Sequence, residues 1–142
     1  MLMVRFSNLE LLRILRENAR TPFLRIAKQL GVTETAVRKR VRRLEEEGII
    51  VRYTVEVDFK KLGYEVHAFI GIDTKPETLI DTIKSLKGLE EVVSLYSTSG
   101  DHMLIAECLF KSSSDLVKFI DKLNSMSGVT RVCPAIVIEK IK

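Results

Sequence analysis

Apolar residues in the first third of the chain recur at the three- and four-residue spacing of a helix. Between Thr33 and Gly48, the residues Val37, Val41 and Leu44 form one apolar stripe, and a stripe of this kind packs against a core. Thr33 is suited to cap the helix at its start, and Gly48 supplies the left-handed residue that ends it. The pattern therefore predicts a helix with one buried side.

Two shorter helices are predicted before this one. The first runs from its cap, Ser7, to about Asn18, and the second from Pro22 to Leu30, because proline is favoured at the first position of a helix and Thr21 can cap it. The inward faces are expected to contain Phe6, Leu9, Leu12, Ile14 and Leu15 in the first helix, and Leu24, Ile26, Ala27 and Leu30 in the second. A tight turn at 31–32 then joins the second helix to the third, which is typical of a helix-turn-helix.

After Gly48 the apolar period changes from helical to two. The apolar positions are Ile49, Val51, Tyr53, Val55 and Val57. This alternation predicts a strand, which the polar pair at 60–61 and a glycine at 63 would close. We therefore expect a helix-turn-helix domain over 1–52, a strand linker over 53–63 and a second domain over 64–142.

The second domain contains a weak internal repeat of forty residues, in which 86–92 matches 126–132 as a helix end, a glycine, an apolar residue, two polar residues and a valine. Each repeat predicts a strand, a helix and a second strand. The expected ranges are 64–73, 76–87 and 91–97 in the first repeat, and 103–110, 113–125 and 129–141 in the second. Two such units form a ferredoxin-like βαββαβ domain with both helices on one face of the sheet, so the fold class is α+β.

The other face of this sheet is expected to be covered. Both alternating sets of residues in 103–110 are largely apolar, and Phe69 lies on the second set of 64–73. An antiparallel sheet with one face in water shows polar residues there. We therefore predict a homodimer related by a two-fold axis, which would carry two helix-turn-helix units to a near-palindromic site on double-stranded DNA.

The two halves of this 142-residue chain differ in net charge. The apolar content of the whole chain, 46%, is enough for a hydrophobic core. Residues 1–52 contain 12 Lys and Arg against 6 Asp and Glu, and residues 53–142 contain 11 against 13, so the net charges are +6 and −2. On the helix over 33–48, basic residues lie opposite the apolar stripe, and the first of them are expected to meet no nearby acid. A basic face of this kind is typical of nucleic-acid binding, although a solvated charged face is the alternative.

The predicted DNA interface has two parts. Side chains for base edges are expected to come from the third helix, since a major groove admits a helix and Arg or Lys can reach guanine acceptors. These residues are Thr35, Arg38, Lys39 and Arg42. Residues expected near the phosphates or at the borders of the interface are Arg20, Arg25, Lys28, Thr33 and Arg43.

Other classes of site lack a signal in the sequence. No run of about 18 apolar residues exists and the start is no signal peptide, so we expect a soluble, cytoplasmic protein that does not bind membranes. Cys108 and Cys133 lack metal-ligand spacing and are predicted to be core thiols. No Ser-His-Asp, phosphate-loop or zinc pattern is present, and His67 and His102 are expected to be a packed and a loop histidine. No catalytic residue, cofactor or metal is therefore expected.

Several segments together carry a resemblance over essentially the whole chain. They are Ala19-Arg-Thr-Pro, Ile26-Ala-Lys-Gln-Leu-Gly-Val, Thr35-Ala-Val-Arg-Lys-Arg-Val-Arg-Arg-Leu-Glu-Glu-Glu-Gly-Ile-Ile, Ser99-Gly-Asp-His and Ser127-Gly-Val-Thr-Arg-Val. In order and spacing the sequence resembles the Lrp/AsnC, or feast/famine, family of transcription regulators of bacteria and archaea. The resemblance implies an archaeal source, a helix-turn-helix, a ligand-sensing domain, dimers that assemble into tetramers or octamers, and an amino acid as effector.

The resemblance also implies an effector site near the loop between the two central strands, at contacts between dimers. Here that loop contains Ser97, Thr98, Ser99, Gly100, Asp101 and His102, and the expected opposite wall at 131–135 includes Arg131, Cys133 and Pro134. Backbone N–H groups and hydroxyls of the loop can bind a carboxylate, and Asp101 can pair with an ammonium. Relatives often carry a second acid where Met103 stands, and an ordinary polar hairpin turn is the alternative.

Two other functions remain open from the sequence. An architectural protein that wraps DNA with little sequence choice would share the basic helix. Some chains with the same two-domain plan resemble siroheme decarboxylases, but those need no basic recognition face, which this chain has.

Overall fold

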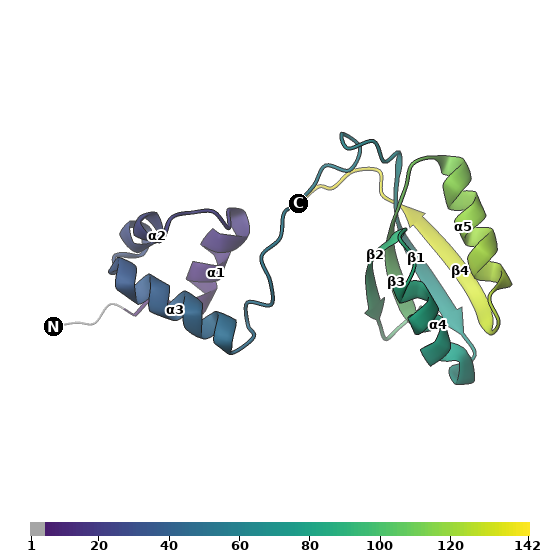
Figure 1. The fold of residues 1–142 in the computed structure, drawn as a ribbon, viewed down its shortest axis with the longest axis horizontal. Coiled ribbons are helices and arrows are strands. Elements are labelled where there is room, and N and C mark those ends of the chain that lie inside the picture. The colour runs from purple at the N-terminus through teal and green to yellow at the C-terminus, as the bar shows by residue number, and fades with distance from the viewer. Residues whose placement is uncertain (1–4) are drawn as a thin grey trace. The chain divides into compact units, whose positions relative to one another are not determined.

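The computed structural model describes residues 5–142 and divides into two compact units, one ending at Glu56 and the other beginning at Val57. Three helices make up the first unit (Figure 1): α1 is Asn8–Glu17, α2 is Phe23–Leu30 and α3 is Glu34–Glu46. None of the helices within 5–142 is long and apolar enough to cross a membrane.

The caps of α1 and α3 form as the sequence predicts. The Ser7 side chain accepts a hydrogen bond from the Glu10 backbone N–H, and the Glu10 carboxylate accepts one from the Ser7 backbone N–H, which completes a capping box. Thr33 Oγ1 accepts from the Ala36 backbone N–H at 3.1 Å, and Gly48 has a φ of 71° just beyond the end of α3. The start and end of α3 are therefore fixed by local chemistry.

The core of the first unit confirms the stripe of α3. Val37, Val41 and Leu44 are almost completely buried and pack with residues of α1 and α2. Two residues predicted to face inward do not, because Leu9 and Leu24 are 58% and 53% exposed. On short helices that contact only two neighbours, fewer residues are covered than the apolar spacing suggests.

The predicted cap and first residue of α2 are wrong. Thr21 donates its hydroxyl to the Asn18 carbonyl at 2.7 Å instead of capping the helix, and Pro22 is itself the N-cap. The hydroxyl thus closes the turn after α1. This leaves Phe23 as the first residue of α2.

The predicted strand over 49–58 is not formed in this chain. No residue of the segment belongs to a strand, and its alternating apolar side chains lie largely in solvent, with Val51 85% exposed. A strand requires a hydrogen-bonding partner, and within 5–142 this segment pairs with no other strand. The apolar residues therefore alternate as in a strand, but the segment has no neighbouring strand to pair with among the described residues.

The second unit has the predicted ferredoxin-like order. Its elements are β1 Val66–Thr74, the 3-10 turn η1 Pro76–Thr78, α4 Leu79–Lys87, β2 Val92–Ser97, β3 Leu104–Phe110, α5 Ser113–Ser125 and β4 Val129–Ile136. The strands form one antiparallel sheet in the order β2-β3-β1-β4. Both helices cover the same face of the sheet (Figure 1), and a core of buried aliphatic and aromatic residues lies between them and the strands.

Register assigns each strand residue to a face of the sheet. Ile70 pairs with Ala106, and both face the helices, while Phe69 pairs with Glu107 and with Ala135 on the other side. We call this second side the open face. Its residues on β1, β3 and β4 are Phe69, Gly71, Ile105, Leu109, Cys133 and Ala135, together with His67, Asp73, Glu107 and Arg131.

In the second unit, two predicted element bounds differ from the structure by more than two residues. Residues 76–78 form the separate turn η1 before α4, and β4 ends at Ile136 and not at 141. The register pairs Ile136 with Ala68 near the start of β1. One further hydrogen bond joins the Val137 N–H to the His67 carbonyl. Beyond it, β4 has passed the start of β1 and has no strand residues to pair with.

Candidate functional site

The exposed side of α3 is the first candidate site. Thr35, Arg38, Lys39 and Arg42 are exposed, and they lie opposite the buried stripe of Val37, Val41 and Leu44. The stripe holds the helix against α1 and α2, so its polar side is presented as a fixed surface. A rigid, solvent-accessible basic helix has the shape and charge required to enter a major groove.

The expectation that the first basic residues of α3 meet no acid is wrong. Arg38 Nη2 lies 2.6 Å from Glu34 Oε1, Arg42 Nε lies 3.1 Å from Glu46 Oε1, and Arg43 Nε lies 3.4 Å from Glu47 Oε1. Each pair joins residues four positions apart, the spacing at which side chains meet on a helix. Exposed pairs of this kind are weak, so the arginines remain able to exchange these acids for DNA.

Arg40, at the flank of α3, has a structural contact. Its Nη1 donates to the Phe6 carbonyl at 3.0 Å and to Asn8 Oδ1 at 2.9 Å, and its guanidinium lies over the Phe6 ring. These bonds tie α3 to the start of α1. Arg40 therefore positions the helix and does not join its exposed face.

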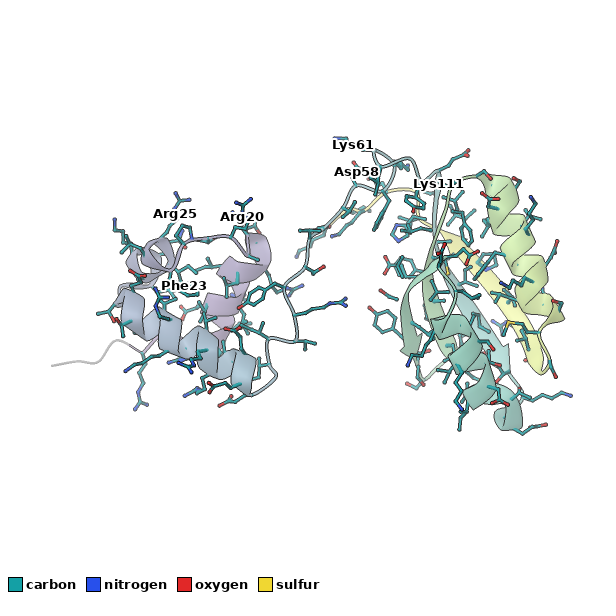
Figure 2. The ribbon with its side chains drawn as sticks, in the orientation of Figure 1. Arg20, Phe23, Arg25, Asp58, Lys61 and Lys111 are labelled. Atoms are coloured by element: carbon teal, nitrogen blue, oxygen red, sulfur yellow. The ribbon has the colours of Figure 1, made fainter. Side chains whose placement is uncertain are left out.

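The predicted phosphate-binding residues lie outside α3. Arg20 precedes α2, and Arg25 and Lys28 lie on it; all three side chains are exposed. Figure 2 shows Arg20 and Arg25 projecting away from the three helices. Arg20, Arg25, Lys28 and Lys39 form no ion pair with any described residue. These cations are therefore available to phosphates.

The second candidate site is a group of charged side chains at one end of the open face, which we call the Asp73 cluster: Asp73, Asp101, His102 and Arg131. Asp73 Oδ2 lies 3.0 Å from His102 Nδ1 and 3.8 Å from Arg131 Nε, and Asp73 Oδ1 accepts from the Met103 N–H at 2.9 Å. Arg131 Nη2 donates to Asp101 Oδ2 at 2.9 Å. The cluster thus connects β1, the β2–β3 loop and β4.

His102 is held within this cluster by packing as well as by charge. Its ring covers Gly71, where a Cβ atom would clash with it. The side chains of His102 and Asp73 are each only 16% exposed. Because an ionised carboxylate can only accept hydrogen bonds, Nδ1 of His102 carries the hydrogen towards Asp73.

The structure brings together only part of the predicted effector site. Asp101, His102, Arg131 and Cys133 lie close together, since Arg131 Nε donates to Cys133 Sγ at 3.2 Å. Pro134 follows Cys133 in β4 and therefore lies on the opposite side of the strand. Of the loop residues, Ser97, Thr98, Ser99 and Gly100 are all exposed, and Thr98 donates its hydroxyl to the His102 carbonyl, which closes the loop.

The two cysteines differ in environment. Cys108 is fully buried, and burial, with smaller contributions from Glu91 and Glu107, raises the pKa of its thiol to about 12. Cys133 is only half-buried and lies on the open face, so the prediction of two core thiols is wrong for Cys133. Within 5–142 no group of three His, Cys, Asp or Glu side chains is placed to hold a metal ion.

Asp73 should make the stability of the second unit depend on pH. Burial raises its pKa, but hydrogen bonds from Met103 and His102 and the charges of His102 and Arg131 outweigh burial, so the pKa is lowered. The ionised carboxylate therefore stabilises the fold above the unfolded-state pKa of about 3.9, and this contribution is lost as the pH falls through the lower, folded-state pKa.

The measurement compares Asp73→Asn with the unsubstituted protein by urea denaturation between neutral and acidic pH. The difference in free energy of unfolding should be largest near neutral pH and shrink below about pH 4. Asp121→Asn, an exposed residue of α5, controls for the loss of one charge. A difference that grows on acidification would contradict the role given to Asp73.

Asp73 and Glu34 are not among the site residues predicted from the sequence. Asp73 is a polar residue at the end of an apolar strand, about thirty residues from the loop it contacts. Only the register of β1 with β3 and β4 brings it there. Glu34 could have been found from its four-residue spacing to Arg38.

Comparison with known families assigns both parts of the chain. Residues 8–45 match the AsnC-type helix-turn-helix domain, and residues 67–142 match the Lrp/AsnC ligand binding domain. The chain is 50% identical to the HTH-type transcriptional regulator LrpA of Pyrococcus horikoshii, over 93% of this chain and 94% of that protein. It is 37% identical to the regulator Ptr1 of Methanocaldococcus jannaschii, over 95% and 92% of the two chains.

Solved structures agree with this assignment. Escherichia coli AsnC is 30% identical with a TM-score of 0.80, over 97% of this chain and 95% of that one. A transcriptional regulator of Neisseria meningitidis, solved as a complex with L-Met, shares the fold with a TM-score of 0.85 at 21% identity, over 97% and 93% of the two chains. With its N-terminal helix-turn-helix and its ferredoxin-like second unit, the chain belongs to the Lrp/AsnC family of transcriptional regulators.

Proposed function

We propose that the protein is a sequence-specific DNA-binding regulator that acts as a homodimer or higher oligomer and responds to an amino acid or a related small metabolite. The observation that carries this proposal is α3, whose aliphatic stripe is buried while Thr35, Arg38, Lys39 and Arg42 are exposed on the opposite side. The second unit supplies the surfaces for self-association and for an effector.

Arg38→Ala should relax sequence choice. Arg38 lies one turn into α3, where the residues of a recognition helix meet base edges. Its loss should reduce discrimination at one base pair of each half-site by about 1–3 kcal/mol. The measurement is the affinity of the full chain for a selected duplex and for its single-base variants, at one fixed salt concentration.

Lys28→Ala is the matched control. Lys28 is an exposed cation of α2 with no ion pair among the described residues, and as a phosphate contact it should weaken binding to all sequences about equally. If the unsubstituted protein bound selected and random duplexes equally at matched salt, it would be an architectural protein. If Arg38→Ala kept every base preference, the assignment of Arg38 would be wrong.

Self-association is supported by two apolar surfaces that no other part of residues 5–142 covers. One is the open face, where Phe69, Ile105 and Ala135 lie beside one another by register. The other is the alternating segment 49–57. A two-fold dimer would cover such surfaces and place two copies of α3 at the half-sites of a near-palindrome.

The effector proposal is supported by the Asp73 cluster and by the bound L-Met in the related fold from Neisseria meningitidis. Asp101 and Arg131 offer one charge of each sign to the ammonium and carboxylate of an amino acid. Their mutual pair is exposed and therefore weak, so a zwitterion can replace it with two pairs of its own.

A thermal-shift screen against the twenty amino acids should find at least one that raises the melting temperature. A ligand present at about a hundred times its Kd stabilises the folded protein by about 2.7 kcal/mol, which corresponds to several degrees. Asp101→Asn should reduce this shift because the carboxylate that pairs with the ammonium is gone. If no amino acid shifted the melting temperature, the effector would not be an amino acid.

A further inference from the structure

Glu34 is an acid at the first residue of α3, and the exposed residues that follow it, from Arg38 to Arg43, are basic. Its carboxylate has a defined place, because Glu34 Oε1 lies 2.6 Å from Arg38 Nη2. The Arg38 guanidinium in turn lies over the Phe23 ring of α2, with Cζ 5.4 Å from the ring centroid. Glu34, Arg38 and Phe23 thus form a small ordered group that joins α2 to the start of α3.

A carboxylate in the first turn stabilises the helix through the helix dipole, and in solution that explains Glu34. On DNA the same position brings a cost. The N-terminal residues of a recognition helix contact base edges, and phosphates on both sides of the groove repel an anion. An acid there is favourable only where it meets a hydrogen-bond donor on a base.

Cytosine presents such a donor in the major groove, the N4 amino group, which Glu and Asp can accept. Guanine presents two acceptors, N7 and O6, that match the arginine guanidinium. Glu34 and Arg38 therefore offer an acceptor and a donor one helical turn apart, on the same side of α3. This is the arrangement that reads a cytosine and a nearby guanine.

We propose that Glu34 is a specificity-determining residue, which accepts a hydrogen bond from a cytosine N4 amino group while Arg38, positioned by Glu34 and Phe23, donates to a neighbouring guanine. This inference rests on the proposed function, since α3 must enter the major groove of a specific site. It adds an acidic residue to the base-reading surface.

Glu46 supplies a matched control within the same helix. It pairs with Arg42 at the same four-residue spacing, with Oε1 3.1 Å from Arg42 Nε, and both side chains are exposed. Glu46 lies at the C-terminal end of α3, which in this docking geometry is not the end that meets the bases. Glu34 and Glu46 thus share their chemistry and differ in position.

The experiment selects duplexes from a randomised pool with the full chain, Glu34→Gln and Glu46→Gln. The unsubstituted protein should prefer cytosine at one position of each half-site by about 5- to 150-fold. Glu34→Gln should lose this preference or change it to adenine, which Gln can pair with through two hydrogen bonds. Glu46→Gln should keep all preferences and bind every sequence more tightly, because one negative charge is removed.

Two outcomes separate the inference from the proposed function. If the unsubstituted protein enriches a site and Glu34→Gln retains the same cytosine, acting only as Glu46→Gln does, Glu34 does not read a base and the inference is overturned. If the unsubstituted protein enriches no sequence at all, the proposed function is wrong and the inference is overturned with it. Helicity measured by circular dichroism confirms that each variant is folded.

Discussion

Phe69→Glu should weaken self-association of the protein by about 100-fold or more. Phe69 lies in the middle of β1, a central strand, and its side chain is on the open face, where it is 38% exposed in the single chain. In a dimer that covers this face, the substitution buries a carboxylate without a partner. The cost of an unpaired buried charge is about 3–5 kcal/mol, and each 1.4 kcal/mol is tenfold in affinity.

The substitution leaves the fold of the single chain in place, because Phe69 points away from the core between the sheet and its helices. Val117→Glu is the matched control, since Val117 is an exposed residue of α5 on the other side of the second unit. Sedimentation velocity over a range of protein concentrations measures the association. A Phe69→Glu protein that dimerises as tightly as the Val117→Glu protein would show that the open face is not the interface.

Loss of the proposed dimer should also weaken DNA binding. Two copies of α3 fixed by one dimer bind two half-sites with the advantage of a high effective concentration. The Phe69→Glu protein should therefore bind a single half-site about as well as the unsubstituted protein does, and lose its preference for a paired site. This connects the open face of the second unit with the function of the first.

The features that the sequence predicts correctly are set by local chemistry. The stripe of α3, its Thr33 cap and Gly48 depend on residues within a few positions of one another. The repeat at 86–92 and 126–132 predicts the ferredoxin-like topology because each copy encodes one strand–helix–strand unit. Each such element carries its own start, end and inward face, which a pattern can show.

The features that the sequence does not predict depend on partners distant in the chain. Leu9 and Leu24 have helical spacing but face solvent, because the contacts between three short helices decide which apolar residues are covered. The alternating segment 49–58 requires another strand, which the described part of the chain does not supply. Asp73 meets His102 and Arg131 only through the register of three strands.

Leu44→Ala should strongly destabilise the helix-turn-helix unit and, with it, DNA binding. Leu44 is fully buried in a small core that is separate from the core of the second unit, and removing its side chain leaves a cavity that costs about 2–5 kcal/mol. A unit of this size has a stability of roughly 3–8 kcal/mol. The loss therefore removes most of the margin that keeps α3 folded.

Leu24→Ala removes the same atoms at an exposed position of α2, and it should change stability little. Thermal denaturation followed by circular dichroism should show an early transition for Leu44→Ala that Leu24→Ala lacks. The helical signal lost in this transition should correspond to α1–α3. The later transition of the second unit and the oligomeric state should remain unchanged, since the two cores share no residue. If Leu44→Ala instead bound DNA normally and melted in a single unchanged transition, the buried stripe would not be what holds the recognition helix in place.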